Sequence, residues 1–537
     1  IISIIAISNA FFFIAMITLK KKNRNLWVHL LMLLALVVFL MNTDIKNIAL
    51  GKLYPGQKII ETRENEFGKI VVTGSQEQFN MYLNGTIINS DHNEMATEES
   101  VHYIMIQRPE SRYVLQVSGN IYNTEKEIKK YHPLHIDFVD INRDIAEMEK
   151  KYFSHDTILF SNVYFQDPRI FIRKSPVKYD VVILNTPDPL YAQSNRFYTF
   201  EFFSELKRCM QTDAVAGLSL PGMENYMNPS SVQLNSSVYN SLRKVFKNVS
   251  IISGNRLFML ASDGNLTLEI AKNITERNIE NVYVNEYFLN DSLIKQKSEK
   301  IISDINASAP VNYDLKPITY YYGLQHWLSF YQASLWLPVM LVSIIFLVMI
   351  FIMKPVNVNL LASGFTSASV EMIIIVAFQS LCGYVYSELS IIITLFMTGL
   401  FTGTSVVPKK LKAGFMHFII MQIILLVFLL IVWVLFNYVL HLSLFVRFVF
   451  YLIVFLLALI TGVQFVLSTR LKNQPNAINA GNSYSIELLG SAAGALLITS
   501  FIIPLLGIPQ TLLLLLALNA VVILITIINK KLLGRFA

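Results

Sequence analysis

The sequence has 537 residues, of which 53% are hydrophobic, and its mean hydropathy is +0.48. This composition excludes a soluble globular protein, and the charged middle of the chain excludes a protein that lies wholly in a membrane. The net charge of +7 does not indicate a nucleic-acid partner, because most of the excess positive charge lies in short loops beside apolar runs. Cys209 and Cys382 lie far apart, so no disulfide framework is expected.

Nine apolar runs are long enough to cross a bilayer, at residues 1–19, 27–42, 333–353, 360–383, 389–407, 415–437, 446–467, 484–505 and 509–529. The first run lacks a basic start and a cleavage site, and the chain begins with Ile1. We therefore expect this run to end an N-terminal bundle whose earlier helices are missing. The expected domains are two transmembrane helices (1–42), a small β-subdomain (43–112), a Rossmann-like domain (113–265), a tail and linker (266–332) and a seven-helix transmembrane block (333–537).

Basic residues near these runs fall on one side of the expected membrane. They are Lys20, Lys21, Lys22, Arg24, Lys354, Lys409, Lys410, Lys412, Arg470, Lys472, Lys530, Lys531 and Arg535. Because Lys and Arg mark cytoplasmic loops, the polar block 43–330 is expected outside the cytoplasm, with a bacterial inner membrane as the location. Lys46 and Lys52 argue against this orientation, and one miscounted helix among the first two would reverse it.

The polar block has the pattern of an α/β domain. Residues 61–89 alternate apolar and polar side chains, which predicts an antiparallel sheet, and Tyr113–Val117 reads as a first Rossmann strand. The turn after that strand keeps a single glycine, Gly119, and its bulky residues Ile121 and Tyr122 are expected to crowd the pocket floor. Asp140 follows the next strand, where an acid either binds ribose hydroxyls or caps the following helix.

The apolar run Val181–Leu184 predicts a buried parallel strand that ends in Asn185-Thr186-Pro187-Asp188-Pro189. Ligands of open α/β sheets bind at this carboxyl edge, so Asn185 and Asp188 are candidate site residues. Asp188 either holds a cationic group or forms a turn before Pro189.

The segment Tyr179–Phe203 resembles the catalytic strand of spermidine synthases, the aminopropyltransferases. The resemblance implies decarboxylated S-adenosylmethionine or S-adenosylmethionine as cofactor, and it places Tyr198 at the same edge. In that family the position of Asn185 carries the acid that serves as base. The family's adenine-reading element has no counterpart between Asp167 and Tyr179, so the cofactor of this chain is left open.

Two other segments carry the same resemblance. Thr97–His102 resembles the family's acid-rich segment that ends in histidine, which implies that Glu98 and His102 bind ligand; the alternative is a helix N-terminus whose acids complement the helix dipole. Residues 364–403 and 485–497 resemble the transmembrane block of membrane-fused spermidine synthase-like proteins, which is related to half of a major-facilitator transporter.

Polar residues inside the apolar runs mark either a pathway or contacts between helices, and they are Glu371, Gln379 and Glu487. The pairs Gly399/Gly403 and Gly490/Gly494 predict close helix packing. No zinc-ligand spacing is present in the sequence, so no metal is expected.

These observations favour a multi-pass membrane protein with an inserted Rossmann-like domain that is degenerate and serves as a non-catalytic scaffold or small-ligand sensor. One alternative is an active aminopropyltransferase with an altered pocket. Another is a transporter-like bundle regulated by the domain. The expected partners are the lipid bilayer and, as a second class, other membrane-protein subunits.

Overall fold

The computed structural model describes residues 45–75, 78–91, 93–154, 159–222, 229–331, 334, 336–383, 386–406, 414–439, 446–471, 477–529. The expected helices at 1–19 and 27–42 lie outside these residues. The chain divides into two compact units, residues 1–93 and 94–537.

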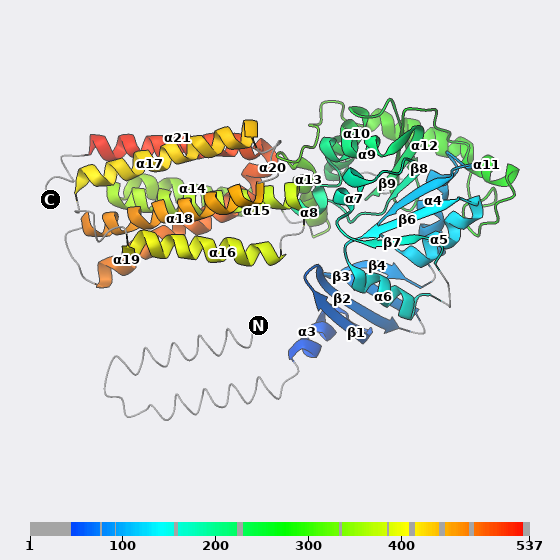
Figure 1. Cartoon of the computed structure of the whole chain (residues 1–537), viewed down its shortest axis with the longest axis horizontal. Coiled ribbons are helices and arrows are strands. Elements are labelled where there is room, and N and C mark those ends of the chain that lie inside the picture. The colour runs from blue at the N-terminus through cyan, green and yellow to red at the C-terminus, as the bar shows by residue number, and fades with distance from the viewer. Residues whose placement is uncertain are drawn as a thin grey trace, which may run out of the picture. The chain divides into compact units, whose positions relative to one another are not determined.

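The first unit contains a short helix and an antiparallel sheet (Figure 1). Its elements are α3 (Ile45–Leu53), β1 (Lys58–Asn65), β2 (Gly68–Ser75), β3 (Gln78–Leu83) and β4 (Thr86–Ser90), with the strands in the order β1-β2-β3-β4. Asn84 and Gly85 join β3 to β4 and both have positive φ, 52° and 85°. Tight hairpins require this conformation, which Asn and Gly adopt at low cost. The antiparallel sheet predicted from the alternating pattern is thus confirmed.

The second unit begins with a seven-stranded sheet in the order β10-β11-β9-β8-β5-β6-β7. The strands are β5 (Tyr113–Val117), β6 (His135–Asp140), β7 (Asn162–Phe165), β8 (Tyr179–Leu184), β9 (Met210–Leu220), β10 (Asn248–Ser253) and β11 (Leu257–Ser262). The pairs from β7 to β9 are parallel, and β11 and β10 add an antiparallel edge. The central strand β8 ends in the apolar run Val181–Leu184, because helices cover both faces of the sheet.

Helices surround this sheet and build two hydrophobic clusters. They are α4 (Glu94–Met105), α5 (Ile121–Ile128), α6 (Arg143–Tyr152), α7 (Pro168–Lys174), α8 (Ala192–Asn195), α9 (Phe200–Arg208), α10 (Pro229–Arg243), α11 (Ile270–Glu276) and α12 (Asp291–Asp304). Side chains of α7, α9 and α10 pack on one face of the sheet, and those of α4, α5 and α11 pack on the other. The fold is a Rossmann-like α/β domain, as the sequence predicts.

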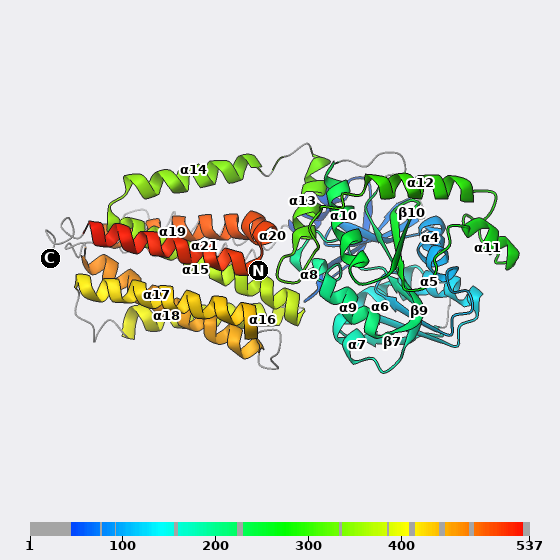
Figure 2. The same cartoon turned by 90° about the horizontal axis from the view of Figure 1, so that it is seen from above.

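The rest of the second unit is helical, and Figures 1 and 2 show its long helices running side by side. The elements are α13 (Ile318–Ser329), α14 (Trp336–Ile352), α15 (Pro355–Cys382), α16 (Tyr386–Phe401), α17 (Phe415–Val434), α18 (Val446–Leu471), α19 (Ala477–Leu497), α20 (Ile503–Leu506) and α21 (Ile508–Ile528). Three π-helical turns extend α16 to Val406, α17 to Val439 and α19 to Ile502. Among the described residues, six helices are long and apolar enough to cross a membrane, and α14 is a shorter apolar helix of 17 residues.

Glycines let the backbones of these helices approach closely. A Cβ atom at Gly490 of α19 would lie 2.1 Å from the Leu361 carbonyl oxygen of α15. A Cβ atom at Gly403 would lie 2.3 Å from the Leu459 carbonyl oxygen of α18. Both contacts are too short for any side chain, so the close packing predicted from the glycine spacing is confirmed.

The α/β domain is joined to the helical bundle by buried arginines. Arg169 of α7 donates to both carboxylate oxygens of Asp314, at 2.9 and 2.7 Å, and to both oxygens of Glu205, at 2.7 and 2.9 Å. It also lies 3.5 Å from the carbonyl oxygen of Ser380, in the last turn of α15. A cation at this position is stabilised by the negative end of the helix dipole.

A second contact lies beside the first. Arg196 donates to the Asp167 carboxylate at 2.5 and 3.2 Å, and both residues pack against Gly383 at the end of α15. The tail before α13 adds a backbone bond, from the amide of Ile508 to the carbonyl of Leu315 at 2.8 Å. The domain therefore contacts the ends of α15 and α21 that lie nearest residues 383 and 508.

The Arg169 side chain is fully buried, whereas the neighbouring Arg173 side chain is 41% exposed and also binds Glu205. Replacing Arg169 with Met leaves Asp314 buried without its cation and Glu205 paired with Arg173 alone, so we expect a loss of about 3 to 5 kcal/mol in stability. Replacing Arg173 with Ala is the matched control, with an expected loss of about 0 to 1 kcal/mol. Thermal unfolding of the purified protein in detergent measures both, and equal losses would contradict the assignment.

Gly383 is expected to tolerate no side chain. Its φ is +93°, and a Cβ atom there would lie 2.3 Å from Asp167 Oδ2 and 2.5 Å from Arg196 Nη1. We expect Gly383→Ala to open this junction and to speed protease cleavage between the domain and the bundle. Gly481→Ala is the control, because nothing lies within 4 Å of a Cβ at that position. Unchanged cleavage kinetics in Gly383→Ala would show that the junction does not depend on this contact.

Candidate functional site

The candidate site is built around the end of β8, where Asn185 emerges from the sheet. The Asn185 amide donates to the carbonyl of Val117 at 2.9 Å, which extends the pairing of β8 with β5. Gly119, in the turn after β5, lies directly against the Asn185 side chain, since a Cβ on this glycine would be 2.6 Å from Asn185 Cβ. Gly119 has a φ of +84°, so both conformation and space require glycine here. The structure thus brings Asn185 and Gly119 together.

The turn continues into α5, and two of its polar groups are bonded to other parts of the chain. The side chain of Asn120 accepts a bond from the Asn123 amide at 3.2 Å and caps the helix. The amide of Ile121 donates to the Glu149 carboxylate at 3.2 Å. Ile121 and Tyr122 are buried in a cluster with Phe138, so these bulky residues fill space under the turn.

Asp140 lies at the end of β6 and is buried. Its carboxylate accepts a hydrogen bond from the amide of Asn142 at 2.8 Å. Burial raises the pKa of Asp140, and the hydrogen bonds from Asn142 and Ser118 oppose this rise. This carboxylate therefore links the two turns that follow β5 and β6, and its role as a ribose ligand stays a prediction.

Asp188 lies three residues beyond Asn185 and forms an ion pair with Arg256. Arg256 comes from the turn between β10 and β11, and its Nη1 lies 3.5 Å from Asp188 Oδ2 while its Nη2 contacts Oδ1. Arg256 also donates from Nε to the hydroxyl of Ser219 at 2.9 Å. The sequence alone does not identify Arg256 as the partner of Asp188, because 68 residues separate them.

Tyr198 is buried and contacts the loop that carries Asp188. Its hydroxyl lies 3.2 Å from the carbonyl oxygen of Thr186 and 3.1 Å from that of Pro187. Burial and the neighbouring Asp188 carboxylate raise the pKa of Tyr198, so the phenol stays protonated. The structure therefore places Tyr198 beside the candidate site, where its hydroxyl contacts backbone carbonyl oxygens.

The polar residues of α4 bind other parts of the domain. Glu98 accepts hydrogen bonds from the amides of residues 282–284, at 2.8 to 2.9 Å. His102 is fully buried between Tyr131 and Glu127, each 2.8 Å from one ring nitrogen. Burial lowers the pKa of His102, and the Glu127 carboxylate opposes this effect. Neither side chain contacts Asn185 or Asp188 in these bonds, and their role as ligands stays a prediction.

Helix α13, which the sequence reading assigned to the linker, packs on the loop of the candidate site. A Cβ atom at Gly323 would lie 2.6 Å from the Pro189 carbonyl oxygen. His326 follows one turn later on the same face, and its Nδ1 is buried without a hydrogen-bond partner among the described residues. Burial lowers the pKa of His326 and the Asp188 carboxylate opposes this, so the imidazole is neutral at pH 7. No local sequence signal marks this histidine.

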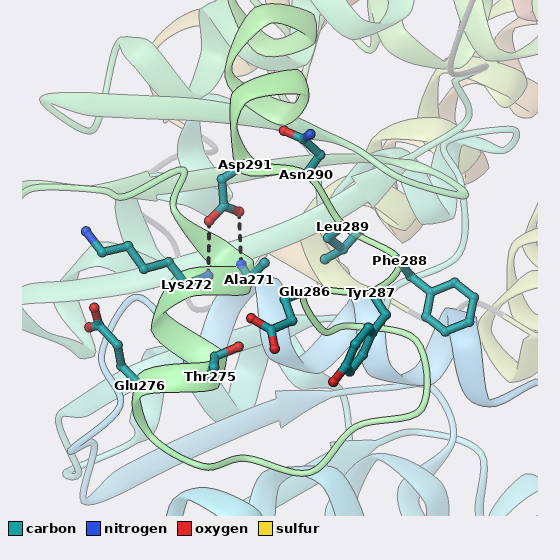
Figure 3. A pocket seen from close by; sticks show the side chains of 10 residues that line it. All are labelled: Ala271, Lys272, Thr275, Glu276, Glu286, Tyr287, Phe288, Leu289, Asn290 and Asp291. Carbon is teal, nitrogen blue, oxygen red and sulfur yellow. Dashed lines mark hydrogen bonds between the residues drawn. The ribbon is translucent and has the colours of Figure 1, made fainter.

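A separate hollow of about 570 Å³ lies between α11 and the start of α12 (Figure 3). Asp291 closes one side, since its carboxylate accepts from the amides of Ala271 and Lys272 at 2.9 and 3.0 Å. Two aromatic side chains, Tyr287 and Phe288, are 87% and 66% exposed at its rim. None of its lining residues comes from the end of β8, so it is not part of the candidate site.

In the bundle, Glu371 and Gln379 lie on α15 and Glu487 lies on α19, all half-buried. Other buried polar residues there bond to one another: Asn519 donates to Thr366 at 2.8 Å and Asn359 donates to Thr526 at 2.9 Å. Among the described residues, no group of His, Cys, Asp and Glu side chains has the arrangement of a metal site.

Residues 94–253 match the family model of the spermine/spermidine synthase domain. Polyamine aminopropyltransferase 2 of Aquifex aeolicus is 28% identical over 172 residues, which are 30% of this chain and 34% of that protein. The polyamine aminopropyltransferase of Clostridium beijerinckii is 25% identical over 166 residues, 30% of this chain and 58% of that protein. The corresponding protein of Sulfurisphaera tokodaii is 26% identical over 204 residues, 36% of this chain and 62% of that protein. The chain thus spans less than two thirds of each relative.

Two solved structures match at lower identity. A spermidine synthase in complex with the transition-state analogue AdoDATO is 18% identical, with a TM-score of 0.39, and covers 45% of this chain and 89% of its own. The spermidine synthase of Thermotoga maritima is 18% identical, with a TM-score of 0.37, and covers 45% of this chain and 87% of its own. From the family match and the curated relatives, we conclude that residues 94–253 form a spermidine synthase-like domain.

Proposed function

We propose that the spermidine synthase-like domain does not catalyse aminopropyl transfer and acts as a scaffold or small-ligand sensor on the membrane bundle. The observation that carries this proposal is Asn185 at the end of β8. An alkyl amine has a pKa near that of lysine, about 10, so a transferase needs a base to remove its proton. The amide of Asn185 can orient an amine through its oxygen but cannot take a proton.

The turn beside Asn185 supports the same conclusion. Nucleotide ligands of this kind of fold bind to free amides at the start of the first helix. Here the amide of Ile121 is bonded to Glu149, and Asn120 caps the helix with its own side chain. These two groups of the turn are therefore bonded to protein groups, and the proposal assigns no cofactor to the turn.

We place the domain outside the cytoplasm, with a bacterial inner membrane as the location. Two contacts support this: Arg169 with the last turn of α15, and Leu315 with the start of α21. Residues 383–388 and 506–509, beside these helix ends, contain no Lys or Arg, whereas Lys354 precedes α15 and Lys530 and Lys531 follow α21 in the sequence. Arg447 lies on the side of the domain, and it pairs with Glu388 at 3.4 Å. The charge bias follows the positive-inside rule if the domain is extracytoplasmic.

The proposed main partner is the lipid bilayer. Large apolar side chains of the bundle are strongly exposed, among them Leu337, Phe351, Met416 and Phe448 at 71%, 86%, 67% and 65%. Such a surface is stable only against acyl chains or other membrane-protein subunits, which are the second class of partner.

A second candidate function, an active transferase with an altered pocket, is favoured by one observation. His326 is a neutral imidazole whose Nδ1 has no partner among the described residues, on the helix that packs against the Pro189 carbonyl. Such a group can accept a proton that Asn185 cannot. On this reading His326 replaces the family's base.

One assay separates the two functions. The full-length protein in detergent is incubated with decarboxylated S-adenosylmethionine and putrescine, and methylthioadenosine is quantified. We expect no product above the enzyme-free rate, while an aminopropyltransferase run in parallel confirms the reagents. Turnover that is lost in His326→Gln would replace our proposal with the second function.

Labelling of single cysteine substitutions tests on which side of the membrane the domain lies. We expect Tyr287→Cys, at a side chain that is 87% exposed in the domain, to react with a membrane-impermeant maleimide in intact cells. Lys354→Cys, at the opposite end of α15, should react only after the membrane is permeabilised. Wild-type protein is the background control for the two native cysteines, of which Cys209 is buried and Cys382 is half-buried. The reverse labelling pattern would place the domain in the cytoplasm.

A further inference from the structure

The first turns of helix α13 are held by both the α/β domain and the bundle. On the side of the domain, the amide of Tyr320 donates to Asn195 Oδ1 at 3.1 Å. On the side of the bundle, the ring of Tyr321 lies edge-on against Phe501, with 5.5 Å between the ring centroids, and Ile318 packs in the same cluster. The position of α13 is therefore fixed by contacts near its start, which leaves its other end free to meet a partner.

Three exposed aromatic rings gather at that other end. Trp327, Phe330 and Tyr331 are 45%, 61% and 68% exposed. Their spacing of three and four residues makes them neighbours, and the ring centroids of Trp327 and Tyr331 are 5.1 Å apart. Single exposed apolar side chains are common on soluble surfaces, but a contiguous aromatic patch indicates contact with a partner.

The aromatic patch borders the apolar surface of the bundle. Trp336, the first residue of α14, is 51% exposed and packs against Phe501, with 4.7 Å between the ring centroids. Because the same Phe501 ring contacts Tyr321, α13 and α14 meet at one side chain. The next exposed side chains of α14 are all apolar: Leu337, Met340, Leu341 and Ile344. The patch is thus continuous with the surface that we assign to acyl chains.

The composition of this segment favours lipid over a protein partner. Residues 318–353 contain no Asp, Glu, Lys or Arg, whereas Lys316 precedes and Lys354 follows them. A charged side chain among acyl chains is costly, so its absence suits a segment that meets lipid. Trp and Tyr favour the boundary between headgroups and acyl chains, because their rings are apolar while their N–H and O–H groups can bond to water.

We propose that the end of α13 is an interfacial anchor, in which Trp327, Phe330 and Tyr331 lie among the lipid headgroups of the leaflet on the side of the domain. Gly323 of the same helix packs against the Pro189 carbonyl, so the anchor also holds the loop of the candidate site at the membrane surface. This inference rests on the proposed function only in that the bilayer is the partner of the bundle, and it does not depend on the absence of turnover.

The test measures quenching of Trp327 fluorescence by lipid in the full-length protein. Trp27, Trp336 and Trp433 are replaced with Phe, and the protein is reconstituted in vesicles of phosphatidylcholine that is brominated on the upper part of its acyl chains. We expect Trp327 to lose roughly half of its emission relative to unbrominated vesicles, because an interfacial side chain reaches about 5 to 10 Å into the boundary between headgroups and acyl chains.

Two proteins that carry a single tryptophan elsewhere are the matched controls. Tyr287→Trp replaces an 87% exposed side chain of the domain, and its emission should not change. Ile423→Trp replaces a 47% exposed side chain near the middle of α17, and lipid around the bundle should quench it. Circular dichroism and gel filtration check that each variant is folded like wild type.

A second measurement keeps all native tryptophans. Tyr331→Cys is labelled with bimane, and we expect the same brominated lipid to quench this label more strongly than a bimane on Tyr287→Cys. Labelled wild-type protein gives the background from Cys209 and Cys382.

The proposal is overturned if Trp327, or the label on Tyr331→Cys, is quenched no more than the matching probe at position 287 while Ile423→Trp is quenched. If Ile423→Trp is not quenched either, the bilayer fails as the partner of the bundle together with the anchor. Neither result affects the proposal of a domain without turnover, which fails only if wild-type protein forms methylthioadenosine.

Discussion

The buried guanidinium of Arg169 is the interaction on which the arrangement of the second unit depends. It contacts Glu205 of α9, Asp314 of the tail and the Ser380 carbonyl of α15, three segments that lie far apart in the sequence. Asp314 also accepts a bond at 2.8 Å from the hydroxyl of Thr199, the residue that caps α9. A buried charge is tolerated only when its partners are all in place, so this contact couples domain, tail and bundle.

Several polar groups of the spermidine synthase-like domain are bonded within the chain. Glu98 binds backbone amides of the tail, Glu99 braces the turn of Arg256, and Tyr198 holds the carbonyls of residues 186 and 187. An enzyme site keeps some polar groups free for its substrate, and their burial is balanced by the ligand. Here protein groups bond Glu98, Glu99 and Tyr198, which supports our proposal of a domain without turnover.

The sequence was informative where the signal is local. The strand at residues 113–117, the antiparallel sheet and the apolar helices follow from periodicity, glycine turns and hydropathy, and the structure confirms them. Arg169, Arg256 and His326 were missed, because their partners come from other elements of the tertiary fold and an arginine or histidine alone has many roles. Asn185 was identified from the sequence, but its contact with Gly119 depends on two adjacent strands.

The last turn of α15 has a consequence for the order of biosynthesis. Arg169 is translated about two hundred residues before Ser380, so the ribosome completes the entire α/β domain before the carbonyl that closes the junction exists. Until α15 has been made, Arg169 can form ion pairs with Glu205 and Asp314, but its contact with the Ser380 carbonyl is missing. Folding of the domain and insertion of the apolar helix are therefore linked in time, and a nascent chain stalled before residue 380 carries an unfinished domain surface.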